Sequence, residues 1–335
     1  MKRADFLKSA LAGAASISTI GRLKPRDGNL IKPRALEAGD TVALTAPAGI
    51  VYDEQEFDRM QGVLESMGFR VVFGEHVKKR YGYLAGTDKQ RADDLNRFFA
   101  DPDVKGIIAV RGGWGSARIL PHLDFSMIRS NPKVYCGFSD NTTLHLAFLR
   151  FADLISFHGP NGTSEWTELT IQNFRSVLMM GEKTEYRSNS EVTTISEGTA
   201  EGRLIGGNLS ILTSSLGTFY EPYTNGAILF TEDIGEEPYK IDRMMTHLKE
   251  AGKLDNLKGF IFGRCTDCPE PSSSSSGFTL KNVLDHHIRP LGIPAIMGAD
   301  IGHDEDNFTI PMALKAKLDA NHGIFTLEES AVIRD

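Results

Sequence analysis

The chain has 335 residues, of which 41% are hydrophobic and 24% are charged. This length exceeds what one hydrophobic core usually holds, so two domains are expected, and the composition is that of an ordinary globular protein. The formal net charge is −7 and lysine and arginine form no visible cluster, which excludes nucleic acid as the main partner because phosphate binding needs a clustered basic footprint.

Residues 1–30 have the profile of a signal peptide. Lys2 and Arg3 are basic, residues 10–20 are small and apolar, and a polar segment follows. The apolar run is too short to be a stable membrane span. The start also resembles a twin-arginine signal in which Ala4 replaces the second arginine. We therefore expect export to the periplasm, with a cytoplasmic location as the alternative, and we exclude this leader from the fold.

From Ala35 onward, strand patterns and helix patterns alternate. Such alternation predicts an α/β fold with a mostly parallel sheet covered by helices on both faces. Ligands of such sheets bind beyond the carboxyl ends of the strands, where Ser116, Ser139 and His158 fall. Strands are predicted over residues 41–46, 70–73, 106–110, 134–136 and 154–157, and helices over 53–67, 89–100 and 141–151.

A glycine turn follows the predicted strand at 106–110. Gly112, Gly113 and Gly115 permit a sharp reversal, which would present Ser116 at the start of a helix. An exposed serine at such a turn is the requirement for a nucleophile. Two other interpretations remain open: Ser116 as a helix N-cap, and a phosphate-binding turn, although Arg118 occupies the last glycine position of G-x-G-x-x-G.

The alternation weakens between residues 166 and 200. A helix is predicted over 171–180, and the polar segment 181–197 is interpreted as a linker or hairpin. We therefore predict an N-terminal domain over 35–165, a linker over 166–200 and a C-terminal domain over 201–335. In the second half, residues 202–208 are predicted to form a glycine turn that opens a helix at 209–216. Further strands are predicted over 226–231, 259–263, 295–297, 308–311, 316–318 and 324–327, and helices over 239–251 and 278–288.

A carboxylate and a histidine stand where a serine nucleophile would need them. A serine hydroxyl requires a base within hydrogen-bond reach and a third group that orients the base. Glu232 follows a predicted strand and His303 lies in a glycine loop, so the site would lie between the domains. Alternatively, Glu232 is a surface acid or a helix cap, and residues 303–306 form a metal loop, although they lack the alternating spacing of a calcium loop.

The three cysteines do not form a disulfide framework. Cys265 and Cys268 form a C-x-x-C, which is compatible with a redox pair, half of a zinc site, or coincidence. No second pair accompanies it, so coincidence or an opportunistic disulfide is favoured.

Seven sequence blocks occur in the order of one known family. They run from about Ala35 to Ala320 and identify the chain as similar to the LD-carboxypeptidase family of serine peptidases, which also includes the microcin C immunity peptidases. The blocks are VRGGWGSARILPHLDF (110–125), GFSDNTTLH (137–145), FHGPNG (157–162), GRLIGGNLSILTSSLGT (202–218), AILFTEDIGEEPYKIDRMMTHLKEAG (227–252), GFIFGRCTDC (259–268) and GADIGHDEDNFTIPMALKAKLDA (298–320).

The resemblance implies a Ser-His-Glu triad. It is carried over to Ser116 as nucleophile, Glu232 and His303. The backbone N–H groups of Gly113 and Ala117 are the expected oxyanion donors, the second by inference from elbow geometry. Ser139, Asn208 and His158 are weaker candidates for substrate contacts, and each could equally be a capping or loop-fixing residue.

The resemblance also implies a reaction and an architecture. The reaction is hydrolysis of the amide between an L-centre and a terminal D-amino acid, typically release of D-alanine from a murein tetrapeptide, without a cofactor. The fold is a flavodoxin-like N-terminal domain and a smaller α/β C-terminal domain, commonly in a homodimer. The alternatives are an immunity-type peptidase that cleaves a peptidyl-nucleotide antibiotic, and a non-catalytic muropeptide-binding protein.

Overall fold

The computed structural model describes residues 30–269 and 277–334. Residues 1–29, which are nearly all of the expected leader, and the whole serine tract at 272–276 lie outside the described residues. Within the described ranges, every helix is too short or too polar to span a bilayer.

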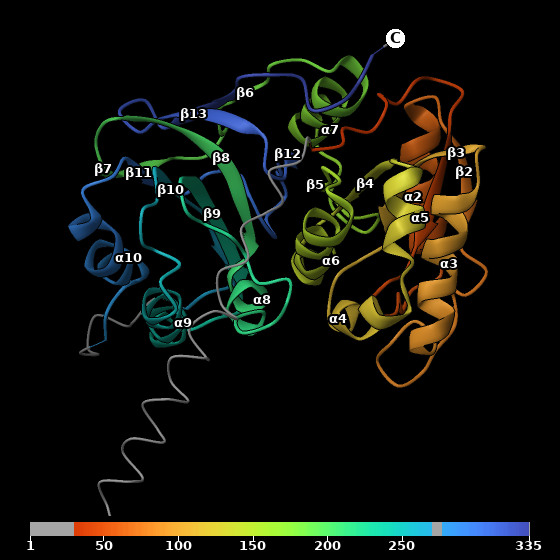
Figure 1. The fold of residues 1–335 in the computed structure, drawn as a ribbon, viewed down its shortest axis with the longest axis horizontal. Coiled ribbons are helices and arrows are strands. Elements are labelled where there is room, and N and C mark those ends of the chain that lie inside the picture. The colour runs from red at the N-terminus through yellow and green to blue at the C-terminus, as the bar shows by residue number, and fades with distance from the viewer. Residues whose placement is uncertain (1–29, 270–276, 335) are drawn as a thin grey trace, which may run out of the picture.

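The strands form two sheets, which lie in separate halves of the molecule (Figure 1). The first sheet has the order β12-β5-β4-β3-β1-β2, and the pairs among β1 to β5 are all parallel. The order 2-1-3-4-5 is that of flavodoxin-like folds, as expected. Its strands are β1 (Thr41–Thr45), β2 (Arg70–Phe73), β3 (Val104–Ala109), β4 (Val134–Gly137), β5 (Phe157–His158) and β12 (Ile310–Pro311).

Helices cover both faces of this sheet. Val42 and Leu44 of β1 pack in the same cluster as Phe57 of α2, whereas Ala43 packs with Leu95 of α3. Because successive side chains of a strand point to opposite faces, α2 and α3 lie on opposite sides, and the central strands are apolar throughout. The helices of this half are α2 (Gln55–Ser66), α3 (Asp88–Ala100), α4 (Ser116–Ile119), α5 (Phe125–Ser130), α6 (Thr142–Ala147) and α7 (Glu168–Arg175), with the short turns η1 (Leu120–His122), η2 (Ser139–Asn141), η3 (Phe148–Ala152) and η4 (Ser176–Met180).

The second sheet has eight strands in the order β6-β14-β13-β8-β9-β10-β11-β7. Its centre, β8 to β11, is parallel, and antiparallel strands complete both edges. The strands are β6 (Glu185–Tyr186), β7 (Thr193–Ser196), β8 (Thr199–Asn208), β9 (Ala227–Ile234), β10 (Gly259–Thr266), β11 (Ala295–Met297), β13 (Lys315–Asp319) and β14 (Ile324–Leu327). The helices are α8 (Leu209–Ser214), α9 (Pro238–Glu250) and α10 (Leu280–Ile288), with η5 at Arg289–Leu291.

The segment 181–197 is neither a plain linker nor a hairpin. Its two short strands, β6 and β7, lie at opposite edges of the second sheet, where β6 pairs with β14 and β7 with β11. The polar sequence reflects these edge positions, since an edge strand has one side without a neighbouring strand.

The predicted glycine turn at 202–208 is wrong, because these residues form part of the long strand β8. A side chain at Gly206 would collide with the backbone of Phe230 on the neighbouring strand, and Gly207 has φ +136°. The glycines therefore permit close packing of strands and a distorted strand end, not a chain reversal.

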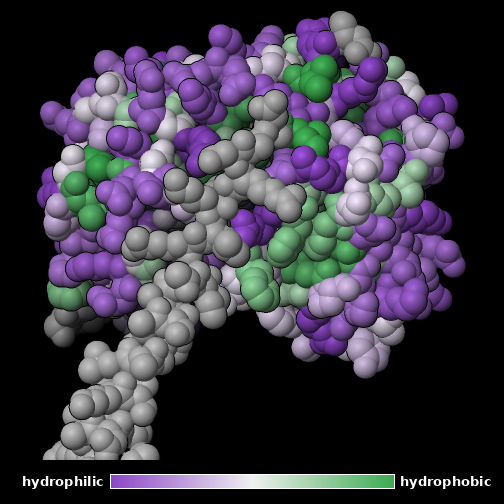
Figure 2. All heavy atoms as spheres, viewed as in Figure 1, coloured by the Kyte–Doolittle hydropathy of each residue, from purple (hydrophilic) through white to green (hydrophobic). Residues whose placement is uncertain are grey.

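The two halves share a core. One cluster of buried apolar side chains includes Val42 and Phe157 of the first sheet together with Phe230 and Phe262 of the second. The surface in the view of Figure 2 is mainly hydrophilic, with apolar residues gathered around α6. The halves are thus joined by packing as well as by the chain.

Candidate active site

A strained serine follows the central strand β4. Ser139 comes two residues after Gly137, has φ +64°, and is the first residue of η2, which leads directly into α6. A non-glycine residue in this left-handed region is sterically costly and persists only where the surrounding structure imposes it. The combination of strand, strained serine and helix is the geometry of a nucleophile elbow.

The glycine turn after β3 lies against this serine. A Cβ atom at Gly112 would be 2.7 Å from Cβ and 2.9 Å from Oγ of Ser139. Only glycine fits there, so the turn is needed for close approach to Ser139. Among the described residues, nothing accepts a hydrogen bond from the N–H of Gly112 or Gly113. These N–H groups are free to bind a developing oxyanion.

The partly buried His303 and the fully buried Glu232, both from the second half of the chain, form a pair. Nδ1 of His303 lies 2.8 Å from Oε2 of Glu232, and the Glu232 side chain is fully buried. Gly302, with φ +125°, allows this contact, because a Cβ there would be 2.8 Å from the same Oε2 atom. The carboxylate fixes the tautomer that carries a proton on Nδ1, which leaves Nε2 able to accept one.

The pair changes the acidity of the histidine. Burial by itself lowers the pKa of His303, but the charge of Glu232 and its hydrogen bond to the ring outweigh this effect, so the pKa is raised above the ordinary value of 6.5. A histidine made more basic in this way is better able to take a proton from a serine hydroxyl.

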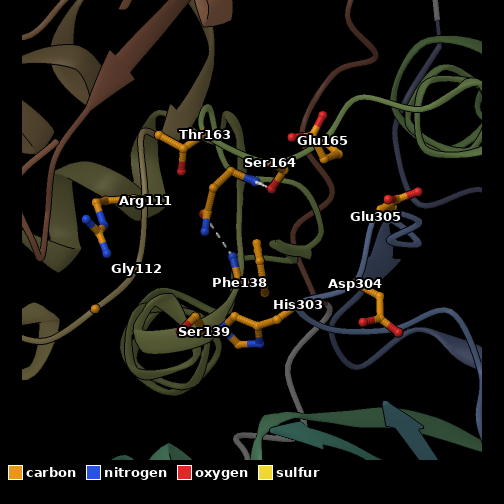
Figure 3. Close-up of a pocket in the computed structure, with 12 residues that line it drawn as sticks. Arg111, Gly112, Phe138, Ser139, Thr163, Ser164, Glu165, His303, Asp304 and Glu305 are labelled. Atoms are coloured by element: carbon orange, nitrogen blue, oxygen red, sulfur yellow. Dashed lines mark hydrogen bonds between the residues drawn. The ribbon is translucent and has the colours of Figure 1, made fainter. Parts of the chain in front are cut away.

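Ser139 and His303 line the same pocket, which has a volume of about 320 Å³. The ring of Phe138, the residue before Ser139, lies edge-on to the His303 ring with centroids 4.7 Å apart. Figure 3 shows the His303 ring next to Ser139, with Arg111 on one side of the pocket and the acidic residues 165, 304 and 305 on the other. The arrangement offers a nucleophile, a base, its orienting acid and two free backbone donors.

Ser116 does not belong to this pocket. It is fully buried, it does not line the pocket, and its Oγ has no hydrogen-bond partner among the described residues. A buried hydroxyl cannot reach a substrate bound at His303. The prediction of Ser116 as nucleophile is therefore corrected. The glycine turn only packs against the elbow, and the serine at the elbow is Ser139, which follows the next strand, β4.

The backbone of Ser116 has a structural role, because it forms a hydrogen bond to the residue after Ser139. Its N–H donates to Oδ2 of Asp140 at 2.7 Å, and the carbonyl of Gly115 accepts from Nη1 of the buried Arg91 at 2.9 Å. Asp140 directly follows Ser139. The contact therefore ties the end of the glycine turn to the elbow serine.

The other predicted site residues separate into two groups. Gly113 lines the pocket, as its predicted role requires. Ala117 lies in α4 outside the pocket, because it was chosen from an elbow centred on Ser116. Asn208 caps α8 and donates to Asp233, and His158 is fully buried, so neither lines the pocket. Asn208 instead binds the residue next to Glu232, and the His158 ring packs edge-on against the Phe138 ring.

The sequence contained a signal for Ser139. Gly137-Phe138-Ser139 follows a buried strand and supplies the first three positions of the nucleophile motif G-x-S-x-G, with Asn141 at the last. The three glycines after β3 form the more conspicuous pattern, although the elbow follows the next strand, β4.

The remaining motifs are resolved by the described residues. Cys265 and Cys268 form a disulfide, the opportunistic alternative of the sequence analysis, and Cys136 is free and buried. Within residues 30–269 and 277–334, no group of three or more His, Cys, Asp or Glu side chains is placed to hold a metal ion. Two of the acidic residues after His303 instead bind protein groups: Asp304 accepts from Nε of Arg264 at 3.0 Å, and Asp306 accepts from Nδ2 of Asn189 at 3.0 Å.

Comparisons with known proteins place the chain among carboxypeptidases and MccF. The chain is 40% identical to the probable murein peptide carboxypeptidase of Bacillus subtilis (strain 168), over 90% of this chain and 94% of that protein. Among solved structures, MccF in complex with glutamyl sulfamoyl guanosine superposes with a TM-score of 0.84 at 26% identity, covering 91% of this chain and 100% of that chain. Muramoyltetrapeptide carboxypeptidase from Oxalobacter formigenes superposes with a TM-score of 0.75 at 31% identity, covering 86% and 97%.

Two family models match most of the described chain. The model of the LD-carboxypeptidase N-terminal domain matches residues 42–159, and that of the LD-carboxypeptidase C-terminal domain matches residues 201–318. The first match includes Ser139, and the second includes Glu232 and His303. The chain therefore belongs to the LD-carboxypeptidase family of serine peptidases.

Proposed function

We propose that this chain hydrolyses the amide bond before the terminal D-amino acid of a murein tetrapeptide, with Ser139, His303 and Glu232 as its catalytic triad. The observation that carries the proposal is the left-handed backbone of Ser139 in the pocket that His303 also lines. The names of the relatives support the substrate class.

The reaction follows from the atoms in the pocket. Oγ of Ser139 attacks the scissile carbonyl while Nε2 of His303 takes its proton, and Glu232 stabilises the charged ring. The N–H groups of Gly113 and Asp140 hold the oxyanion, since elbows use the residue after the nucleophile together with a neighbouring loop. The D-amino acid leaves with the proton from His303. Water then enters, gives a proton to His303, and hydrolyses the acyl-enzyme.

The test is release of D-alanine from a defined murein tetrapeptide, measured by mass spectrometry. We expect Ser139→Ala to reduce kcat by at least ~10³-fold, since triad members contribute that much. Ser116→Ala is the matched control, because it removes a buried hydroxyl from the other serine and leaves its backbone N–H in place. Loss of activity in Ser116→Ala and its retention in Ser139→Ala would reverse the assignment.

A second candidate function is cleavage of a peptidyl-nucleotide antibiotic. It is favoured by the likeness to MccF in complex with glutamyl sulfamoyl guanosine, which has a TM-score of 0.84. Incubation with a glutamyl sulfamoyl nucleoside beside the tetrapeptide distinguishes the two, because the faster substrate by kcat/KM identifies the function. Binding of the tetrapeptide without hydrolysis of either compound would instead support a non-catalytic binding protein.

The proposal extends to location and assembly. The signal-like leader favours export, and the Cys265–Cys268 disulfide is of the kind that persists in oxidising compartments. Fractionation of cells that express the full chain tests the location. The homodimer expected from the family resemblance is tested by light scattering of the purified protein.

A further inference from the structure

The pocket is electrically asymmetric. Apart from His303, Arg111 is the one cationic side chain among the described residues that line it, while Glu165, Asp304 and Glu305 are all acidic. Figure 3 shows these acids on the side of the pocket away from Arg111. An anionic group of a ligand would be repelled by the acidic side and attracted to the arginine.

Most hydrogen-bond donors of the Arg111 side chain have no acceptor among the described residues. Its Nη1 donates to the backbone carbonyl of Ile50 at 2.9 Å, which holds the side chain in place. None of the described acidic residues forms an ion pair with it, although its side chain is partly buried in the pocket wall. A guanidinium has five N–H donors in a planar fork, so most of them are available to a carboxylate.

The position of Arg111 relative to the reacting bond is fixed by the chain. It directly precedes Gly112, where an added Cβ would be 2.7 Å from Cβ of Ser139, and Gly113, which also lines the pocket. In a peptide with one residue beyond the scissile bond, the terminal carboxylate lies about one residue length, roughly 3.8 Å, from the reacting carbonyl. A cation that binds this carboxylate must therefore line the same pocket as the nucleophile, as Arg111 does.

We propose that Arg111 binds the terminal carboxylate of the substrate and thereby restricts cleavage to the last peptide bond. Arg111 is a specificity-determining residue, and the inference rests on the proposed function of the same pocket. A longer peptide has a neutral amide at this place, which leaves the guanidinium without an anion.

The test uses binding, so that it does not depend on turnover. In the Ser139→Ala protein, calorimetry compares a lysine-containing murein tetrapeptide ending in D-alanine with the same peptide as its C-terminal amide. We expect the acid to bind about 10- to 100-fold more tightly, the range of a charge-assisted bidentate contact. Adding Arg111→Met should reduce this ratio to about 1, and Arg111→Lys should retain part of it. Arg243→Met, on the exposed side of α9, is the control and should leave the ratio unchanged.

The outcomes separate this inference from the proposed function. Three results would overturn the role of Arg111. The Ser139→Ala protein with Arg111 intact could bind acid and amide equally, it could bind neither, or Arg111→Met could weaken the binding of both equally. The last result is what a purely structural role predicts, since loss of the bond to Ile50 affects both ligands alike. Failure of the wild-type protein to release D-alanine overturns the proposed function, whereas the acid-to-amide ratio still decides the role of Arg111.

Discussion

Nδ1 of His303 lies 2.8 Å from the fully buried Oε2 of Glu232, and this one contact sets the acidity of the base. Burial opposes the charged ring and the carboxylate favours it, with a raised pKa as the net result. The acid limb of a kcat/KM profile reports the base of the free enzyme, so it should lie above pH 6.5.

Replacing Glu232 with Gln should move that limb. The change removes the negative charge and leaves the burial, so the pKa of His303 should fall, while kcat also falls because the charged ring loses its stabilisation. The measurement is the pH dependence of D-alanine release between pH 5 and 9. An acid limb that stays in place would show that Glu232 does not control His303.

Gly112→Ala should abolish activity while the protein stays folded. A methyl group at position 112 would be 2.7 Å from Cβ of Ser139, so the turn and its N–H donors must move away from the elbow. Loss of one oxyanion donor typically costs ~10²- to 10³-fold in kcat. Gly62→Ala is the control: it lies in α2 with nothing within 4 Å of the added atom, and it should stabilise the fold by about 0.5–1 kcal/mol at unchanged activity. Equal activity of the two variants would contradict this account.

Asp140 should show two different effects on stability. Asp140→Ala leaves the buried N–H of Ser116 without an acceptor and should cost about 1–3 kcal/mol in urea unfolding. Asp140→Asn can keep the acceptor. Because burial raises the pKa of Asp140, the favourable contribution of this group is present at low pH and is lost as the pH rises through the folded-state pKa.

The comparison of these variants across pH is therefore diagnostic. The free energy of unfolding of the wild type should fall relative to that of Asp140→Asn between pH 4 and pH 8. A constant difference over this range would mean that the carboxylate does not change its protonation on folding.

The disulfide should contribute modestly to stability. Cys265 and Cys268 are three positions apart, and closing so short a loop is worth about 2 kcal/mol by the loop-entropy relation. We expect the Cys265→Ser, Cys268→Ser double variant to unfold at lower urea concentration than the oxidised protein. Reduced wild-type protein should match the double variant, and a reductant without effect would argue against the bond.

Much of the fold and part of the site were predictable from the sequence. The central strands β1, β3 and β4 of the first sheet are almost wholly buried, so their apolar runs are conspicuous. Glu232 lies near the end of β9 and His303 lies in a glycine loop. The nucleophile was not predictable in the same way. The nucleophile is distinguished by the left-handed backbone of Ser139, which is a property of the folded chain. The glycines at 112–115 have the pattern of an elbow, but they only pack against the one at Ser139. The turn predicted at 202–208 is wrong for the same reason: in the sequence, a glycine needed for close packing cannot be told from one needed for a turn.

The chain returns to the first sheet near its end. Residues 310–311 form β12 beside β5, with Ile310 paired to His158, although β11 before it and β13 after it belong to the second sheet. His303 lies on this return path, so the distance between base and nucleophile is held by strand pairing on both sides. A cut between residues 181 and 197 would consequently not release two independent modules. The halves should unfold in a single cooperative transition, and an isolated first half would lack both its edge strand and its base.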